Sequence, residues 1–144
     1  MRKNISISLN NKLLKEQGVG LALVFGSYVT GLRHPGSDID VGVVFFDKSK
    51  LKKDSAEVYG SLYEEFTKAF HSEKIDIVYL EEAPLAIQHK AVNDGIISYA
   101  QSPSLFADYK EKVIMDYLDF RFIEDMFNRA ILTSPKNYGP IRSA

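Results

Sequence analysis

The sequence predicts an α/β domain, with a small β-sheet flanked by helices and a long C-terminal helix. Apolar runs of strand length alternate with helical patterns over residues 1–100. The longest helical pattern follows them, over residues 104–132. The chain has 144 residues, of which 45% are hydrophobic and 12% aromatic, as expected for a single globular domain.

The first half of the chain is expected to contain two strands joined by a short helix. Residues 6–17 carry a loose helical pattern, which Gly18 ends. The run over 19–25 is apolar throughout and therefore predicts a central strand that is buried on both faces. A short helix over 27–32 and a second strand over 38–46 complete this half.

The second half begins with a charged link over residues 47–54, whose four lysines we interpret as solvated surface. The regular elements after it are an amphipathic helix over 55–70, a strand over 75–80, a helix over 83–93 ended by Gly95, and a short edge strand over 96–100. The aromatic stripe of the first of these helices belongs to the core. His71 and His89 show no metal-ligand spacing and are expected on the surface or in the core.

A long helix is predicted to begin at Ser102 and Pro103, because a capping residue followed by proline favours a helix start. The side chains of its first part that can pack on the sheet are Tyr109, Val113, Tyr117 and Leu118. Beyond Asp119 the pattern stays apolar, with more large side chains than one small core can bury: Phe120, Phe122, Ile123, Met126, Phe127 and Ile131. An exposed apolar helical surface usually marks a partner interface, so we expect one here.

We therefore expect one domain over residues 1–132, with a core over 1–100 and the helix over 103–132, followed by a flexible tail over 133–144. The formal net charge of −1 argues against a broad nucleic-acid-binding surface. The chain has no cysteine, which excludes disulfides and thiolate metal sites. We find no signal peptide and no apolar run of membrane-spanning length, which indicates a cytoplasmic enzyme without a membrane partner.

The residues that suggest chemistry lie between the first two strands. Gly26-Ser27 follows the first strand, and Asp38-Ile39-Asp40 comes after a gap of ten residues. Glycine permits a sharp turn and the close approach of a ligand. Ser27 stands where a helix should begin, and a helix start is suited to binding phosphate. A capped tight turn without a ligand would have the same geometry, so the two interpretations are compatible.

Asp38 and Asp40 are two residues apart, so their side chains point to the same face of a strand. Neighbouring carboxylates repel, and each raises the pKa of the other unless a cation lies between them. Mg²⁺ meets that need, since it binds one or two carboxylates together with substrate phosphates. Solvation of a strand end is the alternative, but it does not explain the preceding Gly26-Ser27. The pattern thus indicates phosphoryl or nucleotidyl transfer, with Asp38 and Asp40 as metal ligands.

The sequence Gly-Ser, ten residues, Asp-x-Asp closely resembles the signature of the DNA polymerase β-like nucleotidyltransferase superfamily. The short chain and its helical C-terminus resemble the minimal nucleotidyltransferase (MNT) branch, and within it the MntA-type antitoxins that accompany HEPN-domain toxins. The resemblance implies a small mixed β-sheet flanked by helices, and a third carboxylate on a later strand. Asp76 matches that position. The alternative for Asp76 is a buried ion pair with a lysine or arginine, which is a costly arrangement.

The same resemblance implies what the site binds. Two Mg²⁺ ions would be held by Asp38, Asp40 and Asp76, and ATP would be the substrate, with its phosphates at Gly26 and Ser27. Asp76 would also accept the proton of the attacking hydroxyl.

Two residues of the link before Asp38 are further candidates. Arg33 is either a contact of the triphosphate or solvated surface, and His34 could line the pocket.

The resemblance further implies a Mg²⁺-dependent adenylyltransferase that moves AMP from ATP to a tyrosine of a cognate HEPN ribonuclease toxin, and so acts as an antitoxin. Two alternatives stay open. One is a nucleotidyltransferase acting on a small molecule such as an aminoglycoside, although such enzymes usually carry an additional domain. The other is an antitoxin that neutralises its partner by binding alone, although a pure binder has no need of three acids around one site.

Overall fold

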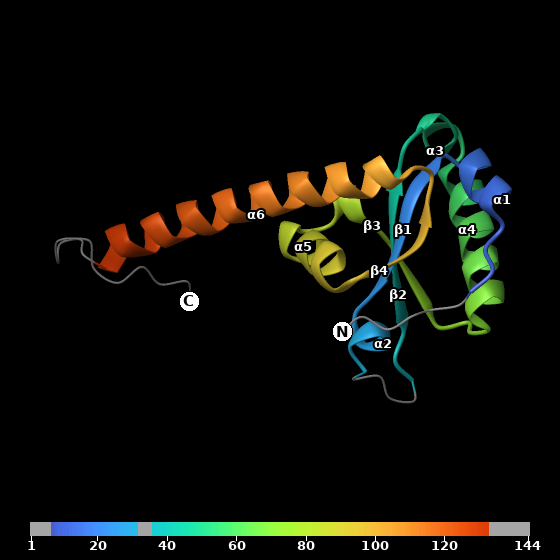
Figure 1. The fold of residues 1–144 in the computed structure, drawn as a ribbon, viewed down its shortest axis with the longest axis horizontal. Coiled ribbons are helices and arrows are strands. Elements are labelled where there is room, and N and C mark those ends of the chain that lie inside the picture. Colours follow the sequence, from blue (N-terminus) through green and yellow to red (C-terminus); the bar gives the residue numbers. More distant parts are fainter. Residues whose placement is uncertain (1–6, 32–35, 133–144) are drawn as a thin grey trace.

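The computed structural model describes residues 7–31 and 36–132 and confirms the α/β fold class. In chain order its elements are α1 (Asn11–Glu16), β1 (Val19–Phe25), α2 (Ser27–Thr30), β2 (Ile39–Phe45), α3 (Ser49–Lys53), α4 (Ser55–Phe70), β3 (Ile75–Tyr79), the 3₁₀ helix η1 (Leu80–Glu82), α5 (Leu85–Asp94), β4 (Ile96–Ala100) and α6 (Pro103–Leu132). Figure 1 shows the sheet between two groups of helices, with the long α6 reaching away from it.

The four strands form one mixed sheet in the order β3-β2-β1-β4. β1 is antiparallel to both β2 and β4, whereas β2 and β3 are parallel. Every residue of β1 is buried, as the apolar run predicted for a central strand, and β4 lies at an edge. The mixed sheet implied by the family resemblance is therefore confirmed.

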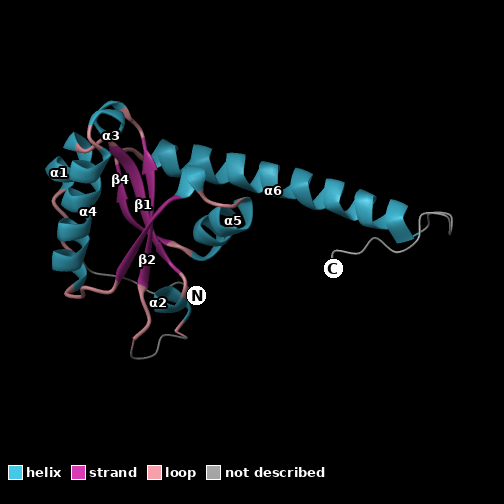
Figure 2. Cartoon of the chain, turned by 180° about the vertical axis from the view of Figure 1, so that it is seen from behind, coloured by secondary structure: helices cyan, strands magenta, loops and turns pink. Residues whose placement is uncertain are grey.

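Apolar side chains of β1 alternate between two cores, one on each face of the sheet. Ala22 and Val24 pack in the core on the side of α1 and α4, which includes the predicted stripe of α4. Leu23 and Phe25 pack in the other core, to which α5 and the beginning of α6 contribute. Figures 1 and 2 show these two helical layers on opposite sides of the sheet.

Several element boundaries differ from the predicted ones. The first helix covers only Asn11–Glu16, because the Asn10 side chain caps it by accepting the N–H of Leu13. β2 begins at Ile39, so Asp38 precedes the strand. The charged link contains the short helix α3, which the sequence pattern did not predict. The predicted tail over 133–144 lies outside the described residues.

Helix α6 contacts the rest of the fold only along its first part. Tyr109 and Val113 are buried as predicted, and Tyr117 stacks on His89 of α5 with ring centroids 3.9 Å apart. Leu118 is 57% exposed, so its predicted packing on the sheet is wrong, because it lies nine residues after Tyr109 and therefore on the opposite side of the helix. No helix in the described ranges is long and apolar enough to cross a membrane.

Candidate active site

The turn between β1 and α2 is built on Gly26, which caps α2 with φ 79° and ψ −152°. This backbone conformation is open to glycine and essentially to no other residue. The carbonyl of Gly26 accepts the N–H groups of Val29 and Thr30, both at 3.1 Å. Gly31, with φ 83°, ends the helix after a single turn. Ser27 is thereby held at the first position of α2, where it is partly exposed.

The two halves of the sequence motif meet between Gly26 and Asp40. In the β1–β2 ladder Phe25 pairs with Asp40, so Gly26 follows the residue directly opposite that carboxylate. A Cβ atom added to Gly26 would overlap the Oδ2 atom of Asp40. Glycine is therefore required here for the backbone conformation, and a larger residue would also displace the carboxylate of Asp40.

The parallel β2–β3 ladder adds the third carboxylate. Asp40 pairs in register with Asp76, so both side chains lie on the same face of the sheet. Between Asp38 and Asp40, Ile39 is buried in the opposite core and donates its N–H to the Lys74 carbonyl at 2.8 Å. The structure thus places Asp40 and Asp76 side by side on the face that carries α5, and Asp38 directly before the strand.

The surroundings of Asp40 disfavour its charged form and raise its pKa above the ordinary value. Burial raises the pKa of Asp40, and the charges of Asp76 and Asp38 raise it further, while the positive charge of Lys90 lowers it. Asp40 is half-buried, and the side chains of Asp38 and Asp76 are exposed. The donor set is carboxylate oxygen alone, which is the chemistry that Mg²⁺ prefers.

The residues therefore fit a hard divalent cation. Within the described ranges no group of three or more His, Cys, Asp or Glu side chains is already gathered to hold a metal ion. Mg²⁺ commonly binds through one or two carboxylates together with substrate phosphates and water. An ion at this site would accordingly be completed by the bound nucleotide rather than by a protein cage.

Lys90 is the residue of the site that the sequence did not reveal. It lies in α5, and nothing in the local helical pattern distinguishes it from other surface lysines. Lys90 is near the acidic residues only because α5 packs on the sheet.

Among the other candidates, those that the structure describes lie away from these acids. Arg33 and His34 lie outside the described residues. The four lysines of the charged link are in or beside α3, at the opposite end of the sheet from α2 (Figure 1). His71 is exposed at the end of α4.

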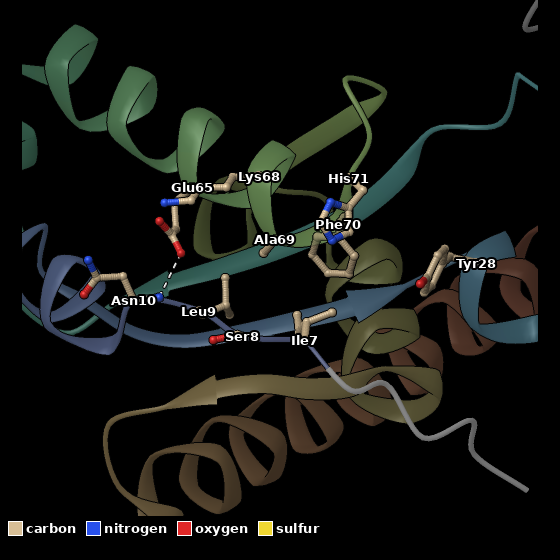
Figure 3. A pocket seen from close by; sticks show the side chains of 10 residues that line it. All are labelled: Ile7, Ser8, Leu9, Asn10, Tyr28, Glu65, Lys68, Ala69, Phe70 and His71. Atoms are coloured by element: carbon tan, nitrogen blue, oxygen red, sulfur yellow. Dashed lines mark hydrogen bonds between the residues drawn. The ribbon is translucent and has the colours of Figure 1, made fainter.

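A pocket of about 540 Å³ lies on the α4 side of the sheet, away from the acids. It is enclosed by residues 7–10, by Tyr28 and by the C-terminal end of α4 (Figure 3). Its buried carboxylate, Glu65, accepts the backbone N–H of Asn10 at 2.8 Å. That hydrogen bond fixes the N-terminal segment to α4, so Glu65 has a structural partner.

The Gly26 turn and the carboxylates beside it are the arrangement expected of a nucleotidyltransferase. Comparison with known proteins indicates the same class of protein. The family model described as polymerase beta, nucleotidyltransferase matches residues 8–104. The chain belongs to this nucleotidyltransferase family. A comparison with curated protein sequences finds no significant match.

Solved structures with this fold include chains of toxin–antitoxin complexes. One, crystallised with AMP-PNP, has a TM-score of 0.62 at 22% identity, over 85% of this chain and 94% of that chain. A second, described as a tri-AMPylated Shewanella oneidensis HEPN toxin in complex with MNT antitoxin, has a TM-score of 0.57 at 21% identity, over 85% and 92%. A third, MntA-HepT, has a TM-score of 0.57 at 19% identity, over 85% and 92%. At these sequence identities, the similarity to the solved structures shows that the chain shares their fold.

Proposed function

We propose that the protein transfers AMP from ATP to a tyrosine hydroxyl of a cognate HEPN toxin in the cytoplasm, and thereby acts as an antitoxin. The observation that carries this proposal is the contact of the Gly26 turn with Asp40, which lies in register with Asp76 and two residues after Asp38. The turn has room for a phosphate and offers it the Ser27 hydroxyl. The carboxylates offer oxygen ligands to the cations that balance the charge of the phosphate. Positioning and charge neutralisation of this kind are most of what nucleotidyl transfer requires.

In the proposed reaction each residue has a distinct part. The Ser27 hydroxyl and the backbone at the start of α2 hold the β- and γ-phosphates. Asp38, Asp40 and Asp76 would hold two Mg²⁺ ions, which supply charge neutralisation at the phosphates and acidify the acceptor hydroxyl. Asp76, which is exposed, accepts the proton of that hydroxyl. The acceptor oxygen forms a bond to the α-phosphorus, the bond from that phosphorus to the bridging oxygen breaks, and pyrophosphate leaves.

A protein acceptor is supported by the second half of α6, residues 119–132, which we call the α6 overhang. Its large apolar side chains are exposed, and Phe122 and Phe127 are 67% and 62% accessible. The overhang projects about 20 Å at the usual helical rise. Monomeric proteins rarely expose so continuous an apolar surface, so a protein partner is the occupant we propose.

The position of this partner follows from the helix period. Phe120, Phe127 and Ile131 continue the line of the buried Tyr109 and Val113 at spacings of four or seven residues, which return to the same side of a helix. A partner that covers this line lies beside α5, on the side of the sheet that carries the acids (Figure 1). It would therefore present its surface toward the site.

The HEPN identity of the acceptor is supported by what the solved structures of this fold are said to contain. One is described as a HEPN toxin that is tri-AMPylated and in complex with MNT antitoxin. The presence of AMP-PNP in another favours ATP as the nucleotide.

Mass spectrometry of a candidate toxin tests the proposal. The toxin is incubated with this protein, ATP and Mg²⁺, in parallel with the variant Asp38→Asn/Asp40→Asn. We expect one or more added AMP units with the native chain and none with the variant. Neutralisation of the toxin that survives in the variant would favour action by binding alone. Pyrophosphate release with a small hydroxyl compound, but not with the toxin, would favour the small-molecule enzyme.

A further inference from the structure

Helix α6 exposes a second apolar face, on the side opposite its buried residues. We call this the α6 outer face; its residues, which are between 54% and 67% exposed, are Met115, Leu118, Phe122 and Met126. Their spacings of three and four residues place them along one side of the helix. Leu118 lies nine residues after the buried Tyr109, which is half a turn further around the helix.

Charged residues of opposite sign lie at the two ends of the α6 outer face. Glu111 comes four residues before Met115, and Arg129 comes three residues after Met126; both are exposed. The two charges are eighteen residues apart, which is about five helical turns, so they lie on the same side of the helix. Arg129 pairs with Asp125 of its own helix at 3.1 Å, and its guanidinium group has further N–H donors for a second carboxylate.

This order of residues is complementary to itself when a second copy of the helix lies antiparallel. Leu118 and Phe122 are each two residues from position 120, and Glu111 and Arg129 are each nine residues from it. With a two-fold axis beside position 120, Leu118 of one copy meets Phe122 of the other, and Glu111 meets Arg129. A parallel pair would instead place each charge against the same charge of the second copy, which is repulsive.

A groove beside the α6 outer face supports the same pairing. It has a volume of about 440 Å³, and its lining residues are Phe106, Ala107, Lys110, Glu111, Ile114 and Met115. Leu132 is 83% exposed and lies twelve residues from position 120, so in the second copy it is level with residue 108, within the segment that lines the groove. It also follows Ile114 by eighteen residues, which places it on the side of the helix that carries the groove.

We propose that two copies of this chain pair antiparallel through the α6 outer face, around a two-fold axis beside position 120. The paired segment, from Glu111 to Arg129, is about 27 Å long at the usual helical rise. The burial of Tyr109 and Val113 already holds its beginning in the fold, so pairing does not have to nucleate the helix.

This pairing goes beyond the proposed function and does not depend on it. The line of apolar side chains that we assign to the toxin, which includes Phe127, lies on the opposite side of α6. Each copy therefore keeps that line accessible while the two outer faces are paired.

Sedimentation velocity of the full chain alone, over a range of concentrations, tests the pairing. We expect the native chain to be a dimer and Phe122→Glu to weaken dimerisation about tenfold or more, as for a central interface residue. Phe127→Glu is the matched control, because it adds the same charge to an equally exposed phenylalanine on the other side of the helix, and it should stay dimeric. Both variants should still unfold cooperatively, since neither side chain is buried.

Charge reversal tests the antiparallel register. Glu111→Arg places an arginine against Arg129 at both ends of the pair, so it should weaken dimerisation severalfold. The double variant Glu111→Arg/Arg129→Glu restores opposite charges at both ends and should recover most of the native dimerisation.

Four results would overturn the inference. A native chain that is monomeric at every concentration would show that the copies do not pair. Equal losses in Phe122→Glu and Phe127→Glu would indicate a general effect of charge on the helix. A double charge reversal weaker than the single one would exclude the antiparallel register. A native chain that is monomeric alone, but loses toxin binding in Phe122→Glu, would assign the α6 outer face to the toxin.

Discussion

At the scale of single residues, Gly26 is the point on which the site depends most directly. It combines a backbone conformation restricted to glycine with the space that the Asp40 carboxylate occupies. We expect Gly26→Ala to lower the free energy of unfolding by about 1–3 kcal/mol and to abolish nucleotidyl transfer. Urea unfolding and the AMP-transfer assay measure the two effects.

Substitutions at two other glycines serve as controls for the two effects of Gly26→Ala, which are backbone strain and overlap with Asp40. Gly31 also has a positive φ, but a Cβ atom there meets no atom of the described residues within 4 Å, so Gly31→Ala reports backbone strain without the overlap. Gly60 lies inside α4 with open space around it, and Gly60→Ala should stabilise the fold by about 0.5–1 kcal/mol. Full activity in Gly26→Ala would show that the turn and Asp40 are not coupled.

The raised pKa of Asp40 predicts how stability depends on pH in the absence of metal. A carboxyl whose pKa is higher in the folded chain than its ordinary value of 3.8 binds its proton more tightly when folded. The free energy of unfolding should therefore fall as pH rises from below 3.8 through the folded-state pKa. Asp40→Asn lacks this dependence, so its advantage over the native chain should grow over that interval. Urea unfolding in EDTA between about pH 3.5 and 7 measures it.

Asp47 provides a control of opposite sign. Hydrogen bonds from Ser49 lower the pKa of this exposed carboxyl, so its contribution to stability is present above 3.8 and is lost as pH falls through the folded-state pKa. Asp47→Asn should accordingly lose stability relative to the native chain as pH rises. If Asp40→Asn behaved in the same way as Asp47→Asn, the acid cluster would not be repulsive.

At the scale of elements, α6 changes its role along its length. Its first part packs on α5, while the α6 overhang leaves the same stripe of apolar side chains exposed. Phe127→Glu should weaken partner binding by about tenfold or more, as for a central interface residue, without lowering the melting temperature. Binding to the toxin by calorimetry and thermal unfolding measure the two properties.

Asn128 gives the matched control for this change. It is the next residue on the helix and is also exposed, but it points away from the apolar stripe. Asn128→Glu adds the same charge and should leave partner binding nearly unchanged. Unfolding caused by Phe127→Glu would mean that the side chain belongs to the core.

The helices and strands that could be predicted from the sequence are those that the spacing of apolar residues along the chain identifies. The continuous apolar run in β1, the period of two in β2 and the four-residue spacing in α4 identify strands and a helix from neighbouring residues alone. The start of β2 was misplaced by one residue, since Asp38 fits a strand pattern but precedes the ladder. The exposure of Leu118 follows from the helix period once Tyr109 and Val113 are known to be buried, because Leu118 lies on the opposite side of α6.

At the scale of the whole molecule, the site is assembled from segments far apart in the chain. The spacing of Gly26, Ser27, Asp38 and Asp40 is visible in the sequence because one turn and one strand carry it. Asp76 could be inferred, since a lone carboxylate interrupts an apolar strand and the family resemblance requires a third acid. Lys90 could not be, since its place depends on how α5 packs on β1, which no local pattern encodes.

The arrangement of the whole molecule predicts that nucleotide binding and partner binding can be separated by removing one segment. A chain that ends at Asp119 keeps both cores, including Tyr109 and Val113, and keeps the stacking of Tyr117 on His89. We expect it to melt within a few degrees of the native chain and to bind AMP-PNP unchanged, since a small surface effect shifts the melting temperature by only a few degrees. Toxin binding should be lost together with the α6 overhang. A second chain ending at Leu132 retains the overhang and should bind the toxin fully. If the shorter chain unfolded, the overhang would be part of the fold; if it still bound the toxin, the partner surface would lie on the sheet or on α5.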